Sequence, residues 1–344
     1  MFQIGIIGCG KIAQVRHLPE YAAHPQAKLA GYYDINTVRA MELSSRYGGT
    51  VYASYQSLLA DPAIDAVSVC SANVTHAEIA IAALKAGKHV LCEKPMATTL
   101  EDCQAMVDTA RACGRFLMVG HNQRLAKAHI KARDLIRQGV IGRVLTFRTI
   151  FAHSGPENWA IDGKQTWFFD KKSAMLGAMA DLGIHKTDLI QYLTGQKVKE
   201  VQAFVSTIDK RGPDGILVGV DDNAICIFKM DGGAVGTMTA SWTNYGSEEN
   251  STVLYGTDGV MRLYADPNYS MVVESRDGQR TFYEIDQIQT NDHQTKSGVI
   301  DLFMESLING TQPEISGEDA LSAMKAVFAA MESAKTGKTM TVES

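Results

Sequence analysis

The sequence of 344 residues lacks the features that mark several classes of protein. It has no run of about 18 apolar residues, so no membrane-spanning helix is expected. Its basic residues form no block, and 33 Lys and Arg against 38 Asp and Glu give a net charge of −5. This balance argues against binding to nucleic acid or to an anionic membrane. No charged segment precedes the first apolar run, so we expect no signal peptide and a cytoplasmic protein.

Cysteine is scarce, and the six cysteines never form a CxxC pair. Cys70 and Cys92 lie within apolar runs, where a cysteine behaves as a small hydrophobic residue. This usage fits a reducing compartment better than a disulfide framework. The sequence also lacks HxH, HExxH and clustered-cysteine patterns, so we expect no metal site.

The first 120 residues alternate short apolar runs with segments of helical pattern. The apolar runs are Phe2–Ile7, Lys28–Tyr33, Ala66–Cys70, His89–Cys92 and Phe116–Val119. Nearly continuous apolar strands separated by helices are typical of a parallel sheet covered on both faces. Pro19 falls in the first helical segment, so we expect that helix to break near Leu18. Capping boxes predict helix starts at Thr75, Thr98 and Ser316.

After about residue 140 the pattern changes to strands separated by tight turns. The expected strands are Arg143–Ala152, Lys199–Ile208, Asn223–Met230, Ala234–Thr243, Thr252–Tyr255 and Ser270–Ser275. One long helical segment, Met175 to Leu193, interrupts them, and a C-terminal helix covers 316–336. We therefore predict an α/β domain over residues 1–122. An α+β domain with a large, open, mostly antiparallel sheet follows over 123–344, and the C-terminal helix packs back towards the first domain.

A glycine-rich loop follows the first predicted strand. Gly8-Cys9-Gly10-Lys11-Ile12-Ala13 fits the pattern GxGxxG/A, and a helical segment follows it. Gly8 permits a tight turn, Gly10 lets the backbone approach a pyrophosphate, and Ala13 allows close packing of helix on strand. The start of the helix then offers free N–H groups to phosphate. These features together predict a Rossmann-type dinucleotide site.

Asp34 ends the second predicted strand, at the position where an acidic residue binds the ribose hydroxyls of NAD. The same carboxylate would repel the 2′-phosphate of NADP by roughly 4 kcal/mol at about 4 Å and an effective dielectric near 20. NAD is therefore favoured, although Arg39 leaves room for NADP. The alternative is a glycine turn of an unrelated fold with Asp34 as a surface carboxylate.

Two further clusters carry side chains suited to chemistry. Glu93-Lys94-Pro95 follows the strand His89–Cys92, and Pro95 is a candidate cis residue. Asp181 and His185 are four residues apart on the long helix, where a histidine beside a carboxylate can act as acid or base near neutral pH. The residues alone leave open a surface ion pair in the first case. In the second they leave open a core or surface Asp–His pair.

The three motifs together resemble the Gfo/Idh/MocA oxidoreductases. The similarity extends over nearly the whole chain, including the segment Ser71 to His76 and Gly120-His-Asn-Gln-Arg124. Two departures are Ala178, where the family often has glycine, and Phe168, where it often has arginine. Both departures affect the expected substrate rather than the expected reaction.

The resemblance implies a role for each matching residue. Lys94 would hydrogen-bond the reacting hydroxyl, Asp181 would bind and orient the substrate, and His185 would be the general base. The expected cofactor-binding residues are Gly8, Gly10, Lys11, Ile12, Asp34, Arg39, Ser71, Asn73, His76, Glu93, Lys94 and Gln123. The expected substrate-binding residues are Lys94, Arg124, His153, Trp167, Asp181 and His185.

The expected activity is NAD-dependent oxidation of a ring secondary alcohol in a cyclitol, such as inositol, or in a sugar or glucoside. An alternative is a glycosidase that oxidises its substrate transiently and releases no NADH. Others are a non-catalytic NAD-binding sensor and a sugar–sugar oxidoreductase that retains its cofactor. The open sheet of the second domain is expected to form a homo-oligomer, either a dimer or a tetramer.

Overall fold

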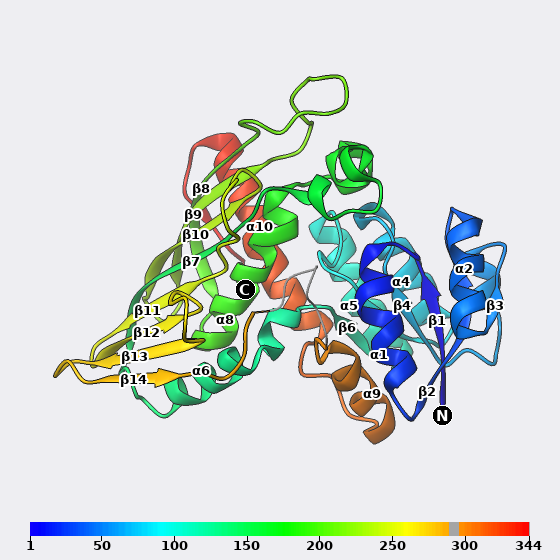
Figure 1. The fold of residues 1–344 in the computed structure, drawn as a ribbon, viewed down its shortest axis with the longest axis horizontal. Helices are drawn as coiled ribbons and strands as arrows, with labels where there is room; N and C mark the ends of the chain where they lie inside the picture. The colour runs from blue at the N-terminus through cyan, green and yellow to red at the C-terminus, as the bar shows by residue number, and fades with distance from the viewer. Residues whose placement is uncertain (289–295, 344) are drawn as a thin grey trace. The chain divides into compact units, whose positions relative to one another are not determined.

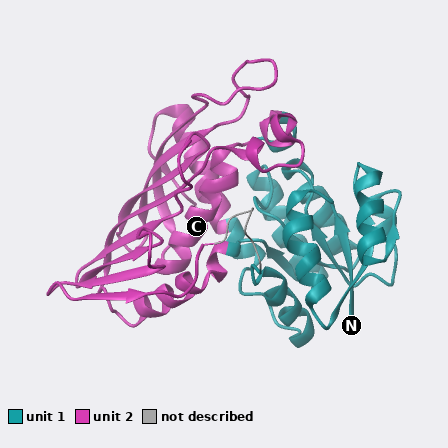
Figure 2. Ribbon diagram, in the orientation of Figure 1, with its two compact units in different colours: residues 1–122, 172–175, 290–321 teal, residues 123–171, 176–289, 322–344 magenta. Residues whose placement is uncertain are grey.

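The computed structural model describes residues 1–288 and 296–343, and Figure 1 shows its fold. The chain forms two compact units, coloured separately in Figure 2. Unit 1 comprises residues 1–122, 172–175 and 290–321, and unit 2 comprises residues 123–171, 176–289 and 322–344. Within the described ranges, no helix combines the length and apolar character that crossing a bilayer requires.

Unit 1 contains a six-stranded parallel sheet with the strand order β3-β2-β1-β4-β5-β6. The strands are β1 Phe2–Ile7, β2 Ala27–Tyr33, β3 Thr50–Val51, β4 Ala66–Val69, β5 His89–Cys92 and β6 Leu117–Val119. The chain runs from β1 outward to β3, then returns to β4 on the other side of β1. The carboxyl ends of β1 and β4 therefore flank the switch point, where sheets of this kind bind ligands.

The helices of unit 1 agree with the predicted alternation of strand and helix. They are α1 Leu18–Ala23, α2 Thr37–Tyr47, α3 Tyr55–Leu59, α4 His76–Lys85, α5 Leu100–Cys113 and α9 Val299–Asn309. A π-helical turn, Ala13–His17, precedes α1, and Pro19 lies in the first turn of α1. The predicted break near Leu18 takes the form of a change in winding, since the backbone stays helical from the π-helical turn into α1. Proline is tolerated there because it lies in the first turn of α1.

Two of the predicted capping boxes are wrong in detail. Thr75 makes no capping bond, because its hydroxyl lies 2.7 Å from Ser71 Oγ and 2.8 Å from the Ala72 carbonyl oxygen. Helix α5 is capped by Thr99 rather than Thr98, and the Thr99 hydroxyl accepts the N–H of Asp102. The cap at Ser316 is confirmed, since its Oγ accepts the N–H of Asp319 at 3.2 Å.

Unit 2 contains a nine-stranded sheet with the order β14-β13-β12-β11-β7-β10-β9-β8-β15. Every neighbouring pair is antiparallel except β7 and β10, so the predicted mostly antiparallel sheet is confirmed. The strands are β7 Val144–Ala152, β8 Val198–Ser206, β9 Asn223–Met230, β10 Val235–Ser241, β11 Thr252–Gly256, β12 Gly259–Leu263, β13 Met271–Ser275, β14 Arg280–Tyr283 and β15 Met340–Thr341.

Unit 2 also contains helical segments, two of which carry the candidate site residues Asp181 and His185. They are α6 Lys127–Arg137, a π-helical turn Met179–Gly183, α8 Ile184–Thr194 and, shared with unit 1, α7 Lys171–Ala174 and α10 Gly317–Thr336. The π-helical turn contacts β10, and α8 contacts β7. Short 3₁₀ turns occupy Asn73–Thr75 in unit 1, and Pro156–Asn158, Gly163–Gln165 and Trp167–Phe169 in unit 2.

The strands of unit 2 alternate buried and exposed residues, as expected for a sheet with one covered face. On β9, Cys226 and Phe228 are fully buried, while Ile225 and Ile227, which alternate with them, are 53% and 50% exposed. Phe204 on β8 is 78% exposed and pairs in register with Ile225. The open face of this sheet therefore presents adjacent apolar side chains.

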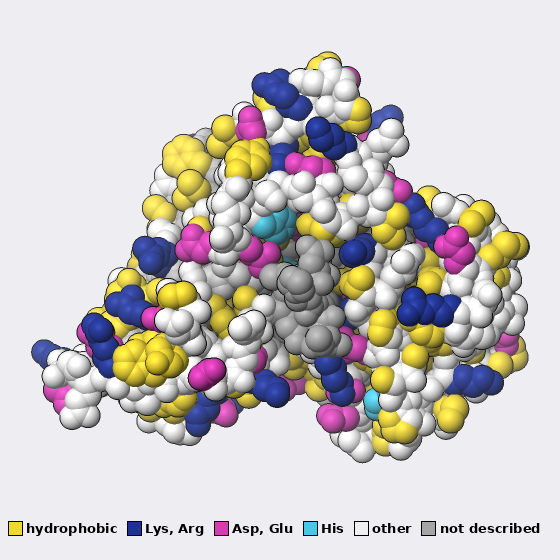
Figure 3. All heavy atoms as spheres, viewed as in Figure 1, with side chains coloured by type: hydrophobic (Ala, Val, Ile, Leu, Met, Phe, Trp, Pro, Cys, Tyr) yellow, Lys and Arg dark blue, Asp and Glu magenta, His cyan; other side chains and the backbone are white. Residues whose placement is uncertain are grey.

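The surface in Figure 3 shows acidic and basic side chains interspersed. This agrees with a chain that has 33 Lys and Arg, 38 Asp and Glu and no basic block. All six cysteines are free thiols, and five of them are buried.

Candidate active site

The glycine loop lies at the switch point of the unit 1 sheet. Gly8 has a φ of 93°, and a Cβ there would come within 2.5 Å of the Cys70 carbonyl carbon and the Ser71 nitrogen. Its N–H donates to the Tyr33 carbonyl oxygen at 2.8 Å. At Gly10, by contrast, a Cβ would meet no atom within 4 Å. The loop thus packs tightly on one side and leaves its backbone open at Gly10.

Asp34 joins this loop to the end of β2. Its Oδ2 accepts the N–H of Cys9 at 2.6 Å, and its Oδ1 accepts the N–H of Asn36 at 2.7 Å. Asn36 in turn caps α2 by accepting the N–H groups of Val38 and Arg39. Each carboxylate oxygen keeps a second lone pair, so Asp34 can still accept hydrogen bonds from a diol.

The segment after β4 holds three of the predicted cofactor residues, Ser71, Asn73 and His76, and all three make hydrogen bonds within the protein. Asn73 Nδ2 donates to the Ala174 carbonyl oxygen at 3.2 Å. The His76 ring contacts carbonyl oxygens on both sides, Pro95 at 2.8 Å from Nδ1 and Ser71 at 3.0 Å from Nε2. Burial lowers the pKa of His76. His76 therefore fixes the loop after β5 against the loop after β4.

Glu93 lies inside unit 1 with 4% exposure, which excludes a surface ion pair with Lys94. Its Oε1 accepts hydrogen bonds from Arg16 Nη1 at 3.2 Å and His17 Nε2 at 2.9 Å, and its Oε2 accepts the N–H of Lys94 at 3.2 Å. Burial acts to raise the pKa of Glu93, but His17 and Arg16 outweigh it and hold this pKa well below its ordinary value. The Lys94–Pro95 peptide is cis, as predicted.

In unit 2, Asp181 and His185 are 6% and 7% exposed, which excludes a helix-surface pair. Asp181 Oδ2 accepts the indole N–H of Trp242 at 3.0 Å and lies 3.9 Å from His153 Nε2. The Phe151 ring lies 5.8 Å from the His153 ring and 5.9 Å from the His185 ring, measured between centroids. Two imidazoles thus lie near one aromatic ring, and the Asp181 carboxylate lies near one of these imidazoles.

The helix that carries these groups differs from its prediction. It begins at Met179 instead of Met175, and its first turn is π-helical. Met175 has a φ of 63°, a left-handed conformation that no helix interior accepts. Asp181 lies in the π-helical turn and His185 in α8, so their spacing of four spans a change in winding.

Comparison with known proteins agrees with both halves of this geometry. Residues 2–121 match the model of an oxidoreductase family with an NAD-binding Rossmann fold, and residues 129–262 match the GFO/IDH/MocA C-terminal domain. The chain belongs to the Gfo/Idh/MocA oxidoreductase family. It is accordingly an NAD-binding oxidoreductase, as the sequence predicted.

Individual members of the family are similar along most of the chain. A levoglucosan dehydrogenase of Pseudarthrobacter phenanthrenivorans is 33% identical over 288 residues, covering 74% of this chain and 72% of the relative. A myo-inositol 2-dehydrogenase of Thermotoga maritima is 26% identical, covering 99% and 98%. A solved levoglucosan dehydrogenase in complex with NADH and L-sorbose matches with a TM-score of 0.88 at 27% identity, covering 99% of both chains.

Unit 1 of this family member has the features that NAD requires. The loop packs closely at Gly8 and is open at Gly10, so a pyrophosphate can approach the backbone there. Asp34 stands at the end of β2 with lone pairs available for ribose hydroxyls. The geometry of the glycine loop and of Asp34 therefore agrees with membership of an NAD-binding family.

Two predicted residues at the start of unit 2 are bound within that unit. The Arg124 guanidinium makes a two-pronged ion pair with the buried carboxylate of Asp188, at 2.7 and 2.6 Å, and lies over the Tyr192 ring. Gln123 Nε2 donates to Asn250 Oδ1 at 3.3 Å. Arg124 thus ties the 3₁₀ turn Asn122–Leu125 to α8, and Gln123 ties it to the loop before β11.

Aromatic side chains extend from Asp181 along the segment after β7. Phe168 stacks on Trp167 with a centroid distance of 4.0 Å and meets Trp159 edge-on at 5.1 Å. Phe168 and Phe169 lie 6.5 and 6.1 Å from the ring of Trp242. The predicted substrate residue Trp167 thus belongs to an aromatic cluster that reaches the indole bound to Asp181.

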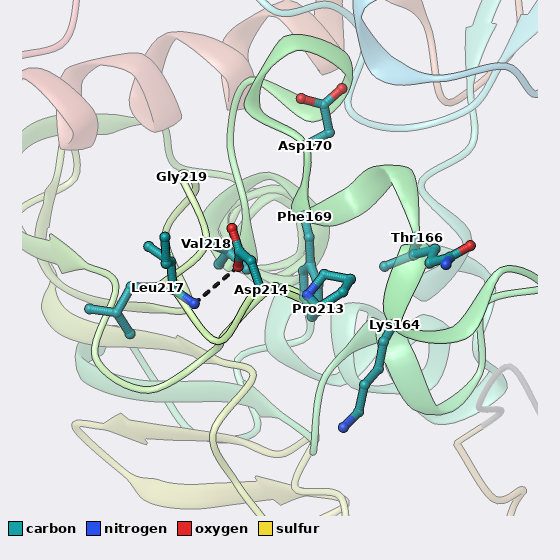
Figure 4. A pocket seen from close by; sticks show the side chains of 12 residues that line it. Lys164, Thr166, Phe169, Asp170, Pro213, Asp214, Leu217, Val218 and Gly219 are labelled. Atoms are coloured by element: carbon teal, nitrogen blue, oxygen red, sulfur yellow. Dashed lines mark hydrogen bonds between the residues drawn. The ribbon is translucent and has the colours of Figure 1, made fainter.

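A pocket of about 330 Å³ in unit 2 is lined by residues of two segments, 164–170 and 212–219 (Figure 4). Lys164, Asp170 and Pro213 are among its lining residues. The dashed line in Figure 4 marks the hydrogen bond from Ile216 N–H to Asp214 Oδ1. The lining does not include Asp181 or His185.

Sequence reasoning did not single out Trp242 or Lys186. Trp242 is fully buried although polar residues flank it in Ser241-Trp242-Thr243, and that contrast is the signal that could have identified it. Lys186 is also fully buried, 5.9 Å from the Phe151 ring. Burial lowers the pKa of Lys186 to about 7. Its Nζ has no hydrogen-bond partner among the residues that the structure describes.

Proposed function

We propose that this protein is an NAD-dependent dehydrogenase that oxidises a ring secondary alcohol of a cyclitol or a sugar. The observation that carries the proposal is the cluster of Asp181, His153 and His185 beside an aromatic wall. Carboxylate and imidazole groups bind hydroxyls, and aromatic rings cover the C–H face of a saturated ring. The names of relatives, among them levoglucosan and myo-inositol 2-dehydrogenases, support this substrate class.

The proposed roles follow from the chemistry of each side chain. When bound, NAD supplies the hydride acceptor. The Lys94 ammonium donates a hydrogen bond to the carbinol oxygen, where negative charge develops, and contributes about 3 kcal/mol. His185 takes the hydroxyl proton, which is worth about 10²–10⁴-fold in rate. Asp181 accepts hydrogen bonds from the substrate and keeps it oriented.

The test is a panel of cyclitols, aldoses and glucosides assayed with NAD by the absorbance of the reduced nicotinamide. We expect NADH to accumulate with at least one ring polyol and its ketone to form in equal amount. Release of an aglycone without accumulated NADH would instead establish a glycosidase. NAD binding by calorimetry without turnover of any polyol would overturn the proposal.

We also propose that the open face of the unit 2 sheet forms a homo-oligomer. Phe204, Ile225 and Ile227 form an exposed apolar group on adjacent strands, and such groups mark association surfaces. The Ile225→Glu variant should lower the mass measured by light scattering. Met41→Glu, which changes an exposed methionine of unit 1, is the control. An unchanged mass for Ile225→Glu would exclude this face.

A further inference from the structure

The start of the helical turn that carries Asp181 is held by Asp221, a residue outside every motif. Asp221 is buried just before β9. Its Oδ1 accepts the N–H of Gly177 and its Oδ2 accepts the N–H of Met179, both at 2.7 Å. Its carbonyl oxygen accepts the N–H of Ala178 at 2.8 Å. One residue therefore satisfies three N–H groups that find no partner within the turn itself.

Gly177 connects this contact to the backbone of Asp181. Its carbonyl oxygen accepts the N–H of Asp181 at 2.9 Å and that of Ala180 at 3.1 Å. A Cβ at Gly177 would lie 1.8 Å from the Asp221 carbonyl oxygen. Only glycine therefore allows Asp221 to come this close, and the position of Asp221 fixes where the turn begins.

Asp222 acts on the Asp181 carboxylate indirectly, through Trp242. Its carbonyl oxygen accepts the backbone N–H of Trp242 at 2.8 Å, and the Trp242 indole donates to Asp181 Oδ2 at 3.0 Å. The Asp222 carboxylate is itself fixed, since it accepts the N–H groups of residues 208, 209 and 210 at 2.7 to 2.8 Å. Two neighbouring aspartates thus reach Asp181 by separate routes, through its backbone and through its carboxylate.

We propose that the Asp221–Asp222 pair is the positioning element that aims the Asp181 carboxylate at the substrate. The inference rests on the proposed function, because it assigns Asp181 to substrate binding. Asp221 must present two acceptor oxygens, one to each N–H. An amide in its place offers one oxygen and turns an NH₂ group towards a donor, so the start of the turn shifts.

The decisive variant is Asp221→Asn, assayed with the polyol that the panel identifies. We expect kcat to fall at least about tenfold while the Kd for NAD stays unchanged, because a small misplacement of a positioning group costs rate. Asp214→Asn is the matched control. Asp214 is an exposed residue that accepts one backbone N–H through one oxygen, which an amide can replace. Full kcat in Asp221→Asn would overturn the inference.

Trp242→Phe provides a second variant that leaves Asp221 intact. It removes the indole N–H from Asp181 and should also lower kcat without changing NAD affinity. In the double variant, the combined loss should be smaller than the product of the two single losses, because both act through one carboxylate. Independent, multiplicative losses would show that the two routes do not meet at Asp181.

Hydrogen exchange separates failure of this inference from failure of the proposed function. The amides of residues 177–181 should lose protection in Asp221→Asn and keep it in Asp214→Asn, whether or not a substrate is known. If wild-type protein oxidises no polyol, the proposed function fails while this measurement still tests Asp221. Unchanged protection at 177–181 in Asp221→Asn contradicts the inference directly.

Discussion

The two units hold their candidate functional residues in different ways. In unit 1, loops at the carboxyl ends of neighbouring parallel strands hold each other, as Asp34 holds Cys9 and His76 holds Pro95. In unit 2, Asp181 depends on Asp221, just before β9, and on Trp242, just after β10. The first arrangement follows from topology, whereas the second depends on long-range packing.

This difference explains why the surroundings of the site residues could be predicted from the sequence in unit 1 but not in unit 2. A parallel sheet brings its strand ends to one edge, so a motif at a strand end predicts its own surroundings. A residue on a helix over an antiparallel sheet meets whichever strand passes beneath it, and only the register decides which side chain that is. Asp181 and His185 could therefore be recognised as candidate site residues, while the residues that position Asp181 could not.

The largest expected effects come from removing one functional group from each unit. Lys94→Ala and His185→Ala should each lower kcat about a hundredfold or more, because one removes charge stabilisation and the other a general base. Steady-state kinetics with the identified polyol measures both effects.

Calorimetry with NAD is the control, because it separates the loss of rate from a loss of cofactor affinity. His185→Ala should keep the wild-type Kd for NAD, whereas Lys94 is also an expected cofactor-binding residue, so kcat of Lys94→Ala is compared at saturating NAD. Substantial turnover by either variant would remove that residue from the mechanism. Loss of NAD binding in His185→Ala would contradict the assignment of His185 to proton transfer rather than to cofactor binding.

Buried ion pairs provide a test of stability within each unit. Glu93→Gln in unit 1 and Asp188→Asn in unit 2 each remove the negative charge from a buried ion pair, with Arg16 in one case and Arg124 in the other. Breaking such a pair costs about 3–5 kcal/mol of unfolding free energy. Urea unfolding at neutral pH measures the loss, and a cost near zero for either variant contradicts the buried pair.

Acid pH should reduce the difference between wild type and Glu93→Gln. The folded-state pKa of Glu93 lies below its ordinary value of 4.5, so the unfolded chain binds the proton first. The carboxylate therefore contributes its stability above about pH 4.5 and loses it as the pH falls towards the folded-state pKa. Urea midpoints between neutral and acid pH test this, and a constant difference over that range would contradict it.

The sequence alone predicted most of unit 1 and the class of unit 2. Phe2–Ile7 and His89–Cys92 form strands with the predicted bounds, because unbroken apolar runs leave little choice in a doubly covered sheet. The helix start predicted at Thr75 is confirmed, since Thr75 is the N-cap residue of α4, but the predicted capping hydrogen bond is absent. The Thr75 hydroxyl donates to the Ala72 carbonyl oxygen instead. A pattern of residue types cannot tell in which direction a hydroxyl will bond.

The elements of unit 2 that the sequence did not predict have no periodic pattern of apolar residues. Strand β12, Gly259–Leu263, was not among the expected strands, and β14 and β15 are short edge strands. The π-helical turn at Asp181 follows from Asp221 and from the left-handed Met175, neither of which leaves a periodic signal. The residue types of the site could be recognised in the sequence. The contacts that position them come from segments distant in the sequence, so they could not be predicted.

The smallest expected effect concerns cofactor choice, where Asp34 tests whether a residue held by its neighbours still recognises a ligand. Asp34→Ser removes the charge that repels a 2′-phosphate, so the preference for NAD over NADP should narrow at least about tenfold, within the roughly 4 kcal/mol of one like-charge pair. A serine accepts only one of the two N–H groups that Asp34 holds, so NAD affinity should also fall. Kd values for both cofactors measure this, with Asp61→Ser as a unit 1 control. An unchanged ratio of the two Kd values would show that Asp34 only stabilises the glycine loop and does not select the cofactor.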